Sequence, residues 1–194
     1  MRQLDARAVF RDWLDAGVRL IQLRAKTLAS GPLLELAQEL AADARAAGAT
    51  FVLNDRADLA RLAGASGVHV GQTDLSPADA RRVLAADAIV GLSTHSEAEL
   101  AAAMDGPIDY VAVGAVFQTS MKGPAHPVVG LDFVRRAAAL GAACAKPIVG
   151  IGGITIERAA SVLDAGASSI AVITDLLSGD PGVRAREYLA VLGL

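Results

Sequence analysis

The chain contains little cysteine, few aromatic residues and no long apolar run. Its 194 residues include one cysteine, Cys144, and aromatic side chains make up 4% of the sequence. One cysteine cannot form an intramolecular disulfide framework, which fits a protein of the reducing cytoplasm. No apolar run approaches the roughly 18 residues that a membrane span needs, and the start of the chain does not have the pattern of a signal peptide. We therefore expect a cytoplasmic protein without a membrane partner.

The chain also lacks an excess of positive charge. Its formal net charge is −3, so we expect no general attraction to nucleic acid or to anionic membranes. Recognition of a phosphate group would therefore depend on local cations. Apolar residues make up 53% of the sequence, which is enough to bury the core of one domain. Because no linker or low-complexity segment interrupts it, we expect residues 1–194 to form a single domain.

Short β-branched or apolar runs alternate with Ala- and Leu-rich amphipathic segments, and the first segment of the chain is helical in pattern. This alternation predicts an α/β fold with a parallel sheet, and the number of repeats favours a (β/α)8 TIM barrel. Only seven strands are recognisable, so we expect the first strand of the barrel to be missing from this sequence. The alternative is a barrel that is open between its first and last positions. The predicted strands lie at residues 18–23, 50–53, 67–70, 88–92, 110–113, 147–150 and 169–172.

The first predicted strand has polar residues at every second position. Side chains alternate along a strand, so Gln22, Arg24 and Lys26 share one face. Both faces of a strand are covered in an α/β protein, and burying unpaired cations is unfavourable. The pattern therefore predicts an anionic ligand, such as a phosphate or diphosphate. The alternative is a charged strand end that extends into solvent.

Two carboxylates follow neighbouring strands. Asp55 comes after the strand at 50–53, and Asp74 comes after the strand at 67–70. Because parallel strands end at the same edge of a sheet, one Mg²⁺ could bridge the two carboxylates and a diphosphate, which is the ligand set that Mg²⁺ favours. The alternatives are a helix N-cap for Asp55 and a turn residue for Asp74.

The loops after later strands also carry polar groups. Ser93 and Thr119 offer hydroxyl donors and Lys122 offers a mobile cation, although each could equally be a helix cap or a solvated side chain. His69 alternates with apolar neighbours, so we expect a hydrogen-bonded interior residue. We expect His95 to be a cap or a supporting group rather than a general base.

A glycine-rich loop separates the strand at 147–150 from the helix that follows. Gly152 and Gly153 would let backbone N–H groups approach a phosphate at a helix N-terminus, and the loops after the last two strands are a frequent phosphate site in barrels. A dinucleotide-binding loop is the competing interpretation, with Asp175 as its acidic partner. Against it, Thr155 stands where the third glycine of that motif belongs.

Six motifs, taken together in chain order, resemble the thiamine phosphate synthase family. The resemblance extends over about residues 17–175. Each motif alone is weak, but each lies at the predicted catalytic rim. The motifs lie at residues 22–26, 54–56, 67–74, 91–95, 117–122 and 151–154.

The resemblance implies a Mg²⁺-dependent alkyl transfer. The family joins hydroxymethylpyrimidine diphosphate to hydroxyethylthiazole phosphate and releases diphosphate through a pyrimidine carbocation. The partners implied are these two small phosphorylated molecules, and the resemblance allows a homo-oligomer. It also implies that Asp55 and Asp74 hold Mg²⁺. The residues implied to be catalytic are Arg24, Lys26, Ser93 and Lys122.

The resemblance assigns the remaining site residues to the two substrates. The first group would hold the pyrimidine diphosphate, with Ser93 and Lys122 completing its contacts, and the second would surround the thiazole phosphate. The first group comprises Gln22, Arg24, Lys26 and Asn54, and the second comprises Thr119, Met121, Gly152, Gly153, Ile173 and Thr174.

The sequence departs from the family pattern at a few positions. Met121 stands where the family usually has a hydroxyl residue, Thr174 stands where serine is common, and the first strand with its acidic end is not recognisable. Two alternatives therefore stay open. A related thiazole tautomerase would have a histidine at Ala115 and tends to lose the carboxylate found here at Asp74. A non-catalytic protein that binds a phosphorylated ligand is the other.

Overall fold

The computed structural model of the protein describes residues 5–119 and 127–194, and one parallel sheet runs through these residues. Its seven strands follow one another in sequence order, and each pairs in parallel with the next. All seven strands expected from the sequence are confirmed, with small shifts at their ends. They are β1 (Leu20–Leu23), β2 (Thr50–Asn54), β3 (Gly67–Val70), β4 (Ile89–Thr94), β5 (Tyr110–Val113), β6 (Ile148–Ile151) and β7 (Ser169–Ala171).

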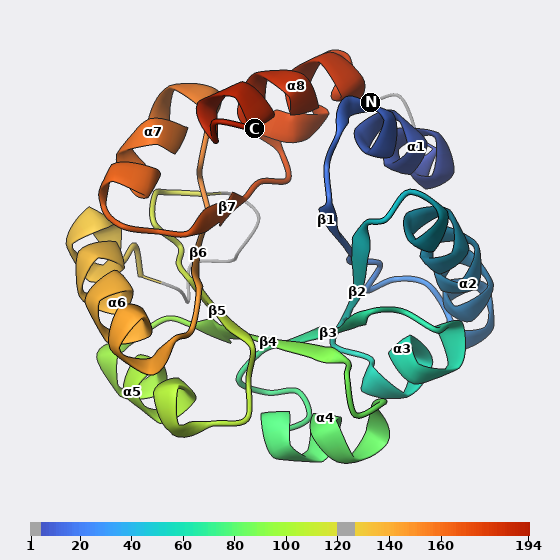
Figure 1. Ribbon diagram of the computed structural model, residues 1–194, viewed down its shortest axis with the longest axis horizontal. Helices are drawn as coiled ribbons and strands as arrows, with labels where there is room; N and C mark the ends of the chain where they lie inside the picture. Colours follow the sequence, from blue (N-terminus) through green and yellow to red (C-terminus); the bar gives the residue numbers. More distant parts are fainter. Residues whose placement is uncertain (1–4, 120–126) are drawn as a thin grey trace.

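Helices form an outer layer around the curved sheet (Figure 1). None of the helices in the described ranges is both long and apolar enough to cross a membrane. A short 3-10 helix, η1 (Asp175–Leu177), follows β7. The α-helices are α1 (Ala6–Ala16), α2 (Ser30–Ala46), α3 (Ala57–Ala63), α4 (Pro77–Val83), α5 (Glu97–Asp105), α6 (Gly130–Cys144), α7 (Ile156–Asp164) and α8 (Pro181–Val191).

The helices pack on the sheet through apolar stripes with helical spacing. In α2 the buried residues include Leu33, Leu36 and Leu40, which recur every three or four positions. They pack in one core with strand residues such as Phe51 and Leu53. Burial of this stripe against the sheet therefore explains why the Ala- and Leu-rich segment is helical.

The sheet is a half-barrel rather than a closed barrel. In the described part of the chain its order runs from β1 to β7, and both of these strands are edges. In Figure 1 the sheet curves inside the ring of helices, and α8 lies beside α1. The α/β class and the TIM-like arrangement are therefore confirmed, but closure by an eighth strand is not. The sequential strand order also contradicts the dinucleotide-binding interpretation, because that fold reverses its strand order at the binding crevice.

Alternate residues of the strands face the inside of the half-barrel. Val68, Val70 and Val111 pack in the core shared with the helices, so His69 and Tyr110 face the opposite way. The strand register places His69 beside Gly91 on β4, and Gly91 beside Tyr110 on β5. One row of the interior face thus contains a histidine, a glycine and a tyrosine on neighbouring strands.

Candidate active site

The carboxyl ends of the strands bring the predicted diphosphate residues to one rim. Gln22 lies in β1, Asn54 is the last residue of β2, and Ser93 lies near the end of β4. Asp55 follows β2 directly, and Asp74 lies in the loop after β3, four residues beyond Val70. The structure therefore confirms that these residues share one end of the sheet, while their roles stay predictions.

The turn after β2 holds Asp55 in an unusual conformation. Its φ of 63° lies in the left-handed region, which few residues other than glycine, asparagine and aspartate adopt. Its backbone N–H donates to the carbonyl of His69 over 2.8 Å, which ties the turn to β3. The N-cap of α3 is Arg56, which makes no side-chain cap bond. The alternative of Asp55 as an N-cap is therefore wrong.

Lys26 and Asp74 set the electrostatics around Asp55. Burial raises the pKa of the Asp55 carboxyl, the hydrogen bond from Lys26 lowers it, and the neighbouring Asp74 carboxyl raises it again. Lys26 Nζ lies 3.0 Å from Asp55 Oδ2. Asp74 Oδ2 accepts a hydrogen bond of 2.8 Å from the N–H of Gly71. Asp74 is thus a turn residue, as the alternative held, and it also lies beside Asp55.

This pair of carboxylates fits a magnesium site completed by a ligand. Two crowded carboxyl groups at one rim favour a bound cation, because a cation offsets their mutual repulsion. Within residues 5–119 and 127–194, no cluster of three histidine, cysteine or acidic residues could hold a metal. The other ligands of a cation at Asp55 and Asp74 would therefore be substrate oxygens and water, which is typical of Mg²⁺.

The side chains on the polar face of β1 are exposed, whereas the sequence had led us to expect both faces of this strand to be covered. The strand ends at Leu23, so Arg24 and Lys26 lie beyond it, and both are exposed, as is Gln22. The reason is that β1 is an edge of the half-barrel, and no strand among the described residues pairs with its outer side. Burial therefore does not force a ligand onto these cations, and the alternative of a charged strand end in solvent describes their exposure.

His69 forms a hydrogen-bonded chain with Ser93 and Tyr110. It is 6% exposed, with Nε2 lying 2.8 Å from Ser93 Oγ and Nδ1 lying 2.8 Å from the Tyr110 hydroxyl. Burial raises the pKa of the Tyr110 phenol, and the charge of Asp109 adds to that effect. The expectation of a hydrogen-bonded interior histidine is confirmed.

His95 also has a structural role. Its backbone N–H donates to Glu99 Oε2 over 2.6 Å, and its ring Nδ1 is hydrogen-bonded to the carbonyl of Gly114. These contacts tie the end of β4 to α5 and to the loop after β5. The expectation of a supporting residue is confirmed.

A pocket of about 350 Å³ lies at the carboxyl ends of β6 and β7. Its lining brings together Thr119, Gly152, Gly153, Ile173 and Thr174, which are the described residues of the predicted thiazole phosphate site. Gly152 and Gly153 have φ values of 98° and 66°, which favour glycine. The other predicted residues of the loop after β5, Met121 and Lys122, lie outside the described residues.

Arg158 also lines this pocket, and the sequence analysis missed it. Its guanidinium donates to the carbonyl of Gly153 over 3.0 Å and lies 4.9 Å from the centre of the Phe117 ring. In the sequence it is one basic residue in an amphipathic helix, so no local pattern distinguishes it. The available signal was distant in the sequence: Phe117, in the loop after β5, offers an aromatic ring over which an arginine can lie.

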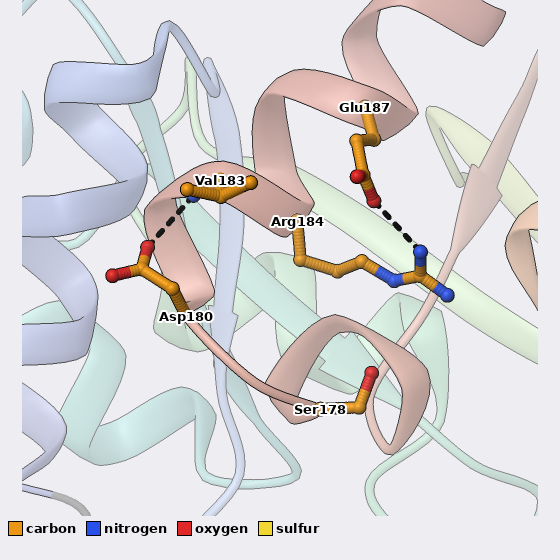
Figure 2. Close-up of a pocket in the computed structure, with 5 residues that line it drawn as sticks. All are labelled: Ser178, Asp180, Val183, Arg184 and Glu187. Carbon is orange, nitrogen blue, oxygen red and sulfur yellow. Dashed lines mark hydrogen bonds and ion pairs between the residues drawn. The ribbon is translucent and has the colours of Figure 1, made fainter.

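Asp175 anchors the end of the β7 loop to α8. Its Oδ2 lies 2.7 Å from Arg184 Nη2 and accepts a hydrogen bond of 2.5 Å from the hydroxyl of Tyr188. Figure 2 shows Arg184 extending to Glu187 in a neighbouring pocket of about 310 Å³. Asp175 is therefore engaged within the protein, which argues further against its role as the acidic residue of a dinucleotide site.

Over most of its length the chain is similar to one family of known proteins. The family model described as thiamine monophosphate synthase matches residues 2–176. The thiamine-phosphate synthase of Koribacter versatilis is 47% identical over 182 residues, covering 94% of this chain and 84% of that protein. The thiamine-phosphate synthase of Thermus thermophilus is 45% identical over 177 residues, covering 91% of this chain and 83% of that protein.

Solved structures agree with the sequence comparisons. The thiamine phosphate pyrophosphorylase of Pyrococcus furiosus superimposes with a TM-score of 0.89 at 29% identity, covering 99% of this chain and 91% of that one. The phosphoribosyl anthranilate isomerase of Thermotoga maritima has a TM-score of 0.65 at 13% identity, which shows a shared fold alone. The residues of the rim, the extent of the family match and these relatives lead to one conclusion: the chain belongs to the thiamine monophosphate synthase family.

Proposed function

We propose that this protein is a thiamine-phosphate synthase, which joins hydroxymethylpyrimidine diphosphate to hydroxyethylthiazole phosphate and releases diphosphate. The observation that carries the proposal is the meeting of Lys26, Asp55 and Asp74 at the rim that also bears the glycine-lined pocket. A rim with a cation site and a phosphate pocket suits a reaction between two phosphorylated molecules. The names of the two relatives described above support the same activity.

Asp55 and Asp74 would hold Mg²⁺ at the diphosphate end of this site. When bound, Mg²⁺ supplies neutralisation of the diphosphate charge. Lys26 and Arg24, which extend from the end of β1, add positive charge beside the carboxylates, and Asn54 offers an amide at the end of β2. These side chains would orient the diphosphate and stabilise the charge that develops as it leaves.

The reaction needs no nucleophile from the protein. The bond between the pyrimidine methylene carbon and the diphosphate oxygen breaks, and its electron pair leaves with diphosphate. The lone pair of the thiazole nitrogen then forms the new carbon–nitrogen bond with the resulting cation. The chain contributes by holding the two molecules close together and by stabilising the leaving group. Lys122 and Ser93 would act on the same leaving group.

The pocket beside Gly152 and Gly153 would hold the thiazole phosphate. Glycine at these positions exposes backbone N–H groups, and Thr119 and Thr174 add hydroxyl groups, so the pocket can bind a phosphate by neutral donors. Met121 lacks the hydroxyl that the family usually has at that position. We expect weaker binding of the thiazole phosphate as a consequence.

The structure also bears on the alternatives. A tautomerase would have a histidine at Ala115, but Ala115 is 3% exposed and its Cβ lies 2.7 Å from where a Cβ on Gly152 would lie. A large side chain at position 115 would therefore need space that the loop after β6 occupies. Binding of thiazole phosphate without turnover is the remaining alternative.

Several broader features of the protein stay predictions. We propose that one further parallel strand, pairing with β1 and β7, completes a (β/α)8 barrel. The 49% exposure of Leu20 on β1 supports this, because an apolar side chain at a sheet edge gains stability when a strand covers it. The single-domain organisation, the cytoplasmic location and a homo-oligomeric state likewise stay predictions.

The direct test measures thiamine phosphate after the purified protein is mixed with both substrates, with and without Mg²⁺. We expect product only with the metal, and loss of product of about a hundredfold or more in Asp74→Asn. Circular dichroism of the variant serves as the control for folding. A folded wild-type protein that binds thiazole phosphate in calorimetry but forms no product would support the binding-only alternative and overturn the proposal.

A further inference from the structure

In the interior row of His69, Gly91 and Tyr110, the contact between the two outer residues depends on glycine, which has no side chain, at the central position. The three residues lie side by side on β3, β4 and β5. A Cβ on Gly91 would lie 2.1 Å from Cζ of Tyr110 and 2.4 Å from its hydroxyl oxygen. The tyrosine ring therefore occupies the space above the glycine, and this is how its hydroxyl reaches His69 on the far side of β4.

Ser93 lies on the same face of β4, two residues beyond Gly91 and thus closer to the rim. Its hydroxyl oxygen lies 2.8 Å from Nε2 of His69, while Nδ1 of the same ring lies 2.8 Å from the Tyr110 hydroxyl. A continuous chain of hydrogen bonds thus leads from Tyr110 in the interior, through the imidazole, to Ser93 at the rim.

The hydrogen bond to Tyr110 sets the direction of this chain. Among the described residues, His69 is the hydrogen-bond partner of the Tyr110 hydroxyl. A buried O–H that fails to donate is unfavourable, so the phenol donates to Nδ1. A neutral imidazole with Nδ1 as acceptor carries its proton on Nε2. His69 Nε2–H then donates to Ser93 Oγ, and the hydroxyl hydrogen of Ser93 points away from the histidine.

We propose that Tyr110 is a positioning residue, which fixes the Nε2–H tautomer of His69 so that the Ser93 hydroxyl donates its hydrogen to an anionic oxygen of the substrate. In the opposite tautomer Ser93 would donate to Nε2, and its lone pairs would face the anion. The tautomer is inferred from the hydrogen bonds of Tyr110 and Ser93 to the ring, and this inference does not depend on the proposed function. The effect on catalysis rests on the proposed function, in which the anionic oxygen belongs to the leaving diphosphate.

The tautomer is measured without substrate by ¹⁵N NMR of the histidine rings at mildly alkaline pH. The chain has three histidines, and a His69→Asn sample identifies the signals of His69. We expect the Nε2–H form in the wild type and an appreciable Nδ1–H population in Tyr110→Phe, which removes the hydroxyl and keeps the ring. Tyr188→Phe is the matched control, because its hydroxyl bonds to Asp175 instead, and it should leave the His69 signals unchanged.

The kinetic test asks whether Tyr110 acts through Ser93. We expect Tyr110→Phe to lower kcat about tenfold and to change KM for either substrate by less than about twofold, because the donor is misdirected rather than lost. Ser93→Ala should lower kcat about a hundredfold. Adding Tyr110→Phe to Ser93→Ala should produce no further decrease, whereas independent effects would multiply.

Gly91→Ala tests the same relationship from the other side. The new methyl group displaces the Tyr110 ring, so this variant should reproduce the tautomer change although it keeps the hydroxyl. An Nδ1–H tautomer in the wild type, or an unchanged tautomer in Tyr110→Phe, would overturn the proposed hydrogen-bond direction. Multiplicative losses in the double variant would overturn the route through Ser93. Absence of synthase activity in the wild type would instead count against the proposed function, because the NMR result does not depend on it.

Discussion

Lys26 and Asp55 form an ion pair between the ends of the neighbouring strands β1 and β2, with 3.0 Å between Nζ and Oδ2. The lysine side chain is 53% exposed and the aspartate side chain 21% exposed. The pair therefore lies at the rim with one partner in solvent, where it contributes little to folding. Its position beside Asp74 brings one cationic and two anionic side chains together at the rim.

Replacing Lys26 by methionine should affect one substrate and spare the fold. We expect kcat/KM for the pyrimidine diphosphate to fall about a hundredfold, because a cation beside the leaving group is lost. The stability to urea should change by less than about 1 kcal/mol. Arg136→Met, which removes an exposed ion pair with Glu97, is the control for loss of charge and should leave the kinetics unchanged. Equal losses for both substrates would contradict the assignment of Lys26 to the diphosphate.

Asp55 should make the metal-free protein less stable as the pH rises. Burial first, and then the Asp74 carboxyl, raise the pKa of Asp55 above its usual value despite the hydrogen bond from Lys26. A carboxyl with a raised folded-state pKa contributes stability below its unfolded pKa and loses that contribution as the pH rises through the folded pKa. The melting temperature of Asp55→Asn minus that of the wild type should therefore increase as the pH rises from the acid range to neutral.

Magnesium should reduce the difference in melting temperature between Asp55→Asn and the wild type at neutral pH. Added Mg²⁺ should raise the melting temperature of the wild type at neutral pH and leave that of Asp55→Asn unchanged, because ligand binding to the folded state stabilises it. Differential scanning calorimetry with and without the metal measures both effects. An equal response of the two proteins to Mg²⁺ would place the metal elsewhere.

Arg158 should contribute to binding of the thiazole phosphate. It supplies positive charge to the lining of a pocket that otherwise offers neutral donors, so Arg158→Ala should raise KM for that substrate roughly fivefold to tenfold. KM for the pyrimidine diphosphate should stay the same. Arg158→Lys keeps the charge but loses the planar group that lies over Phe117, so its KM for the thiazole phosphate should lie between those of the wild type and Arg158→Ala. Unchanged KM values in Arg158→Ala would show that this arginine serves the loop alone.

The core stripe of α2 provides a stability prediction that is independent of the site. Leu40 is 2% exposed, so Leu40→Ala should lower the free energy of unfolding by about 2–5 kcal/mol. Leu62 on α3 is 64% exposed, and Leu62→Ala should change it by less than about 0.5 kcal/mol. Urea denaturation of the two variants measures this contrast.

Local patterns were sufficient to predict the strands and the shared rim. The run at 67–70 is apolar apart from His69 and is bounded by turn residues, and β3 has these same bounds. Asp55 and Asp74 could be paired because parallel strands end together. The N-cap alternative for Asp55 could not be decided, because it depends on a backbone angle that aspartate adopts only in some turns.

Contacts between distant segments could not be predicted in the same way. The apolar neighbours of His69 predict an interior residue, but its partners come from β4 and β5 and depend on the register of the sheet. Similarly, the exposure of Gln22 and Arg24 follows from the position of β1 at an edge. No property of those residues themselves reveals that position.

The ring of Tyr110 fills the space that a side chain on Gly91 would need. The two positions are therefore sterically coupled, although 18 residues lie between them in the sequence. A sequence that keeps the tyrosine ring in this place has no room for a side chain at position 91, and a side chain there requires a displaced or smaller residue at position 110. A change that adds a side chain at position 91 therefore breaks the connection to His69, so this pair of sites constrains how the interior of the half-barrel can diverge.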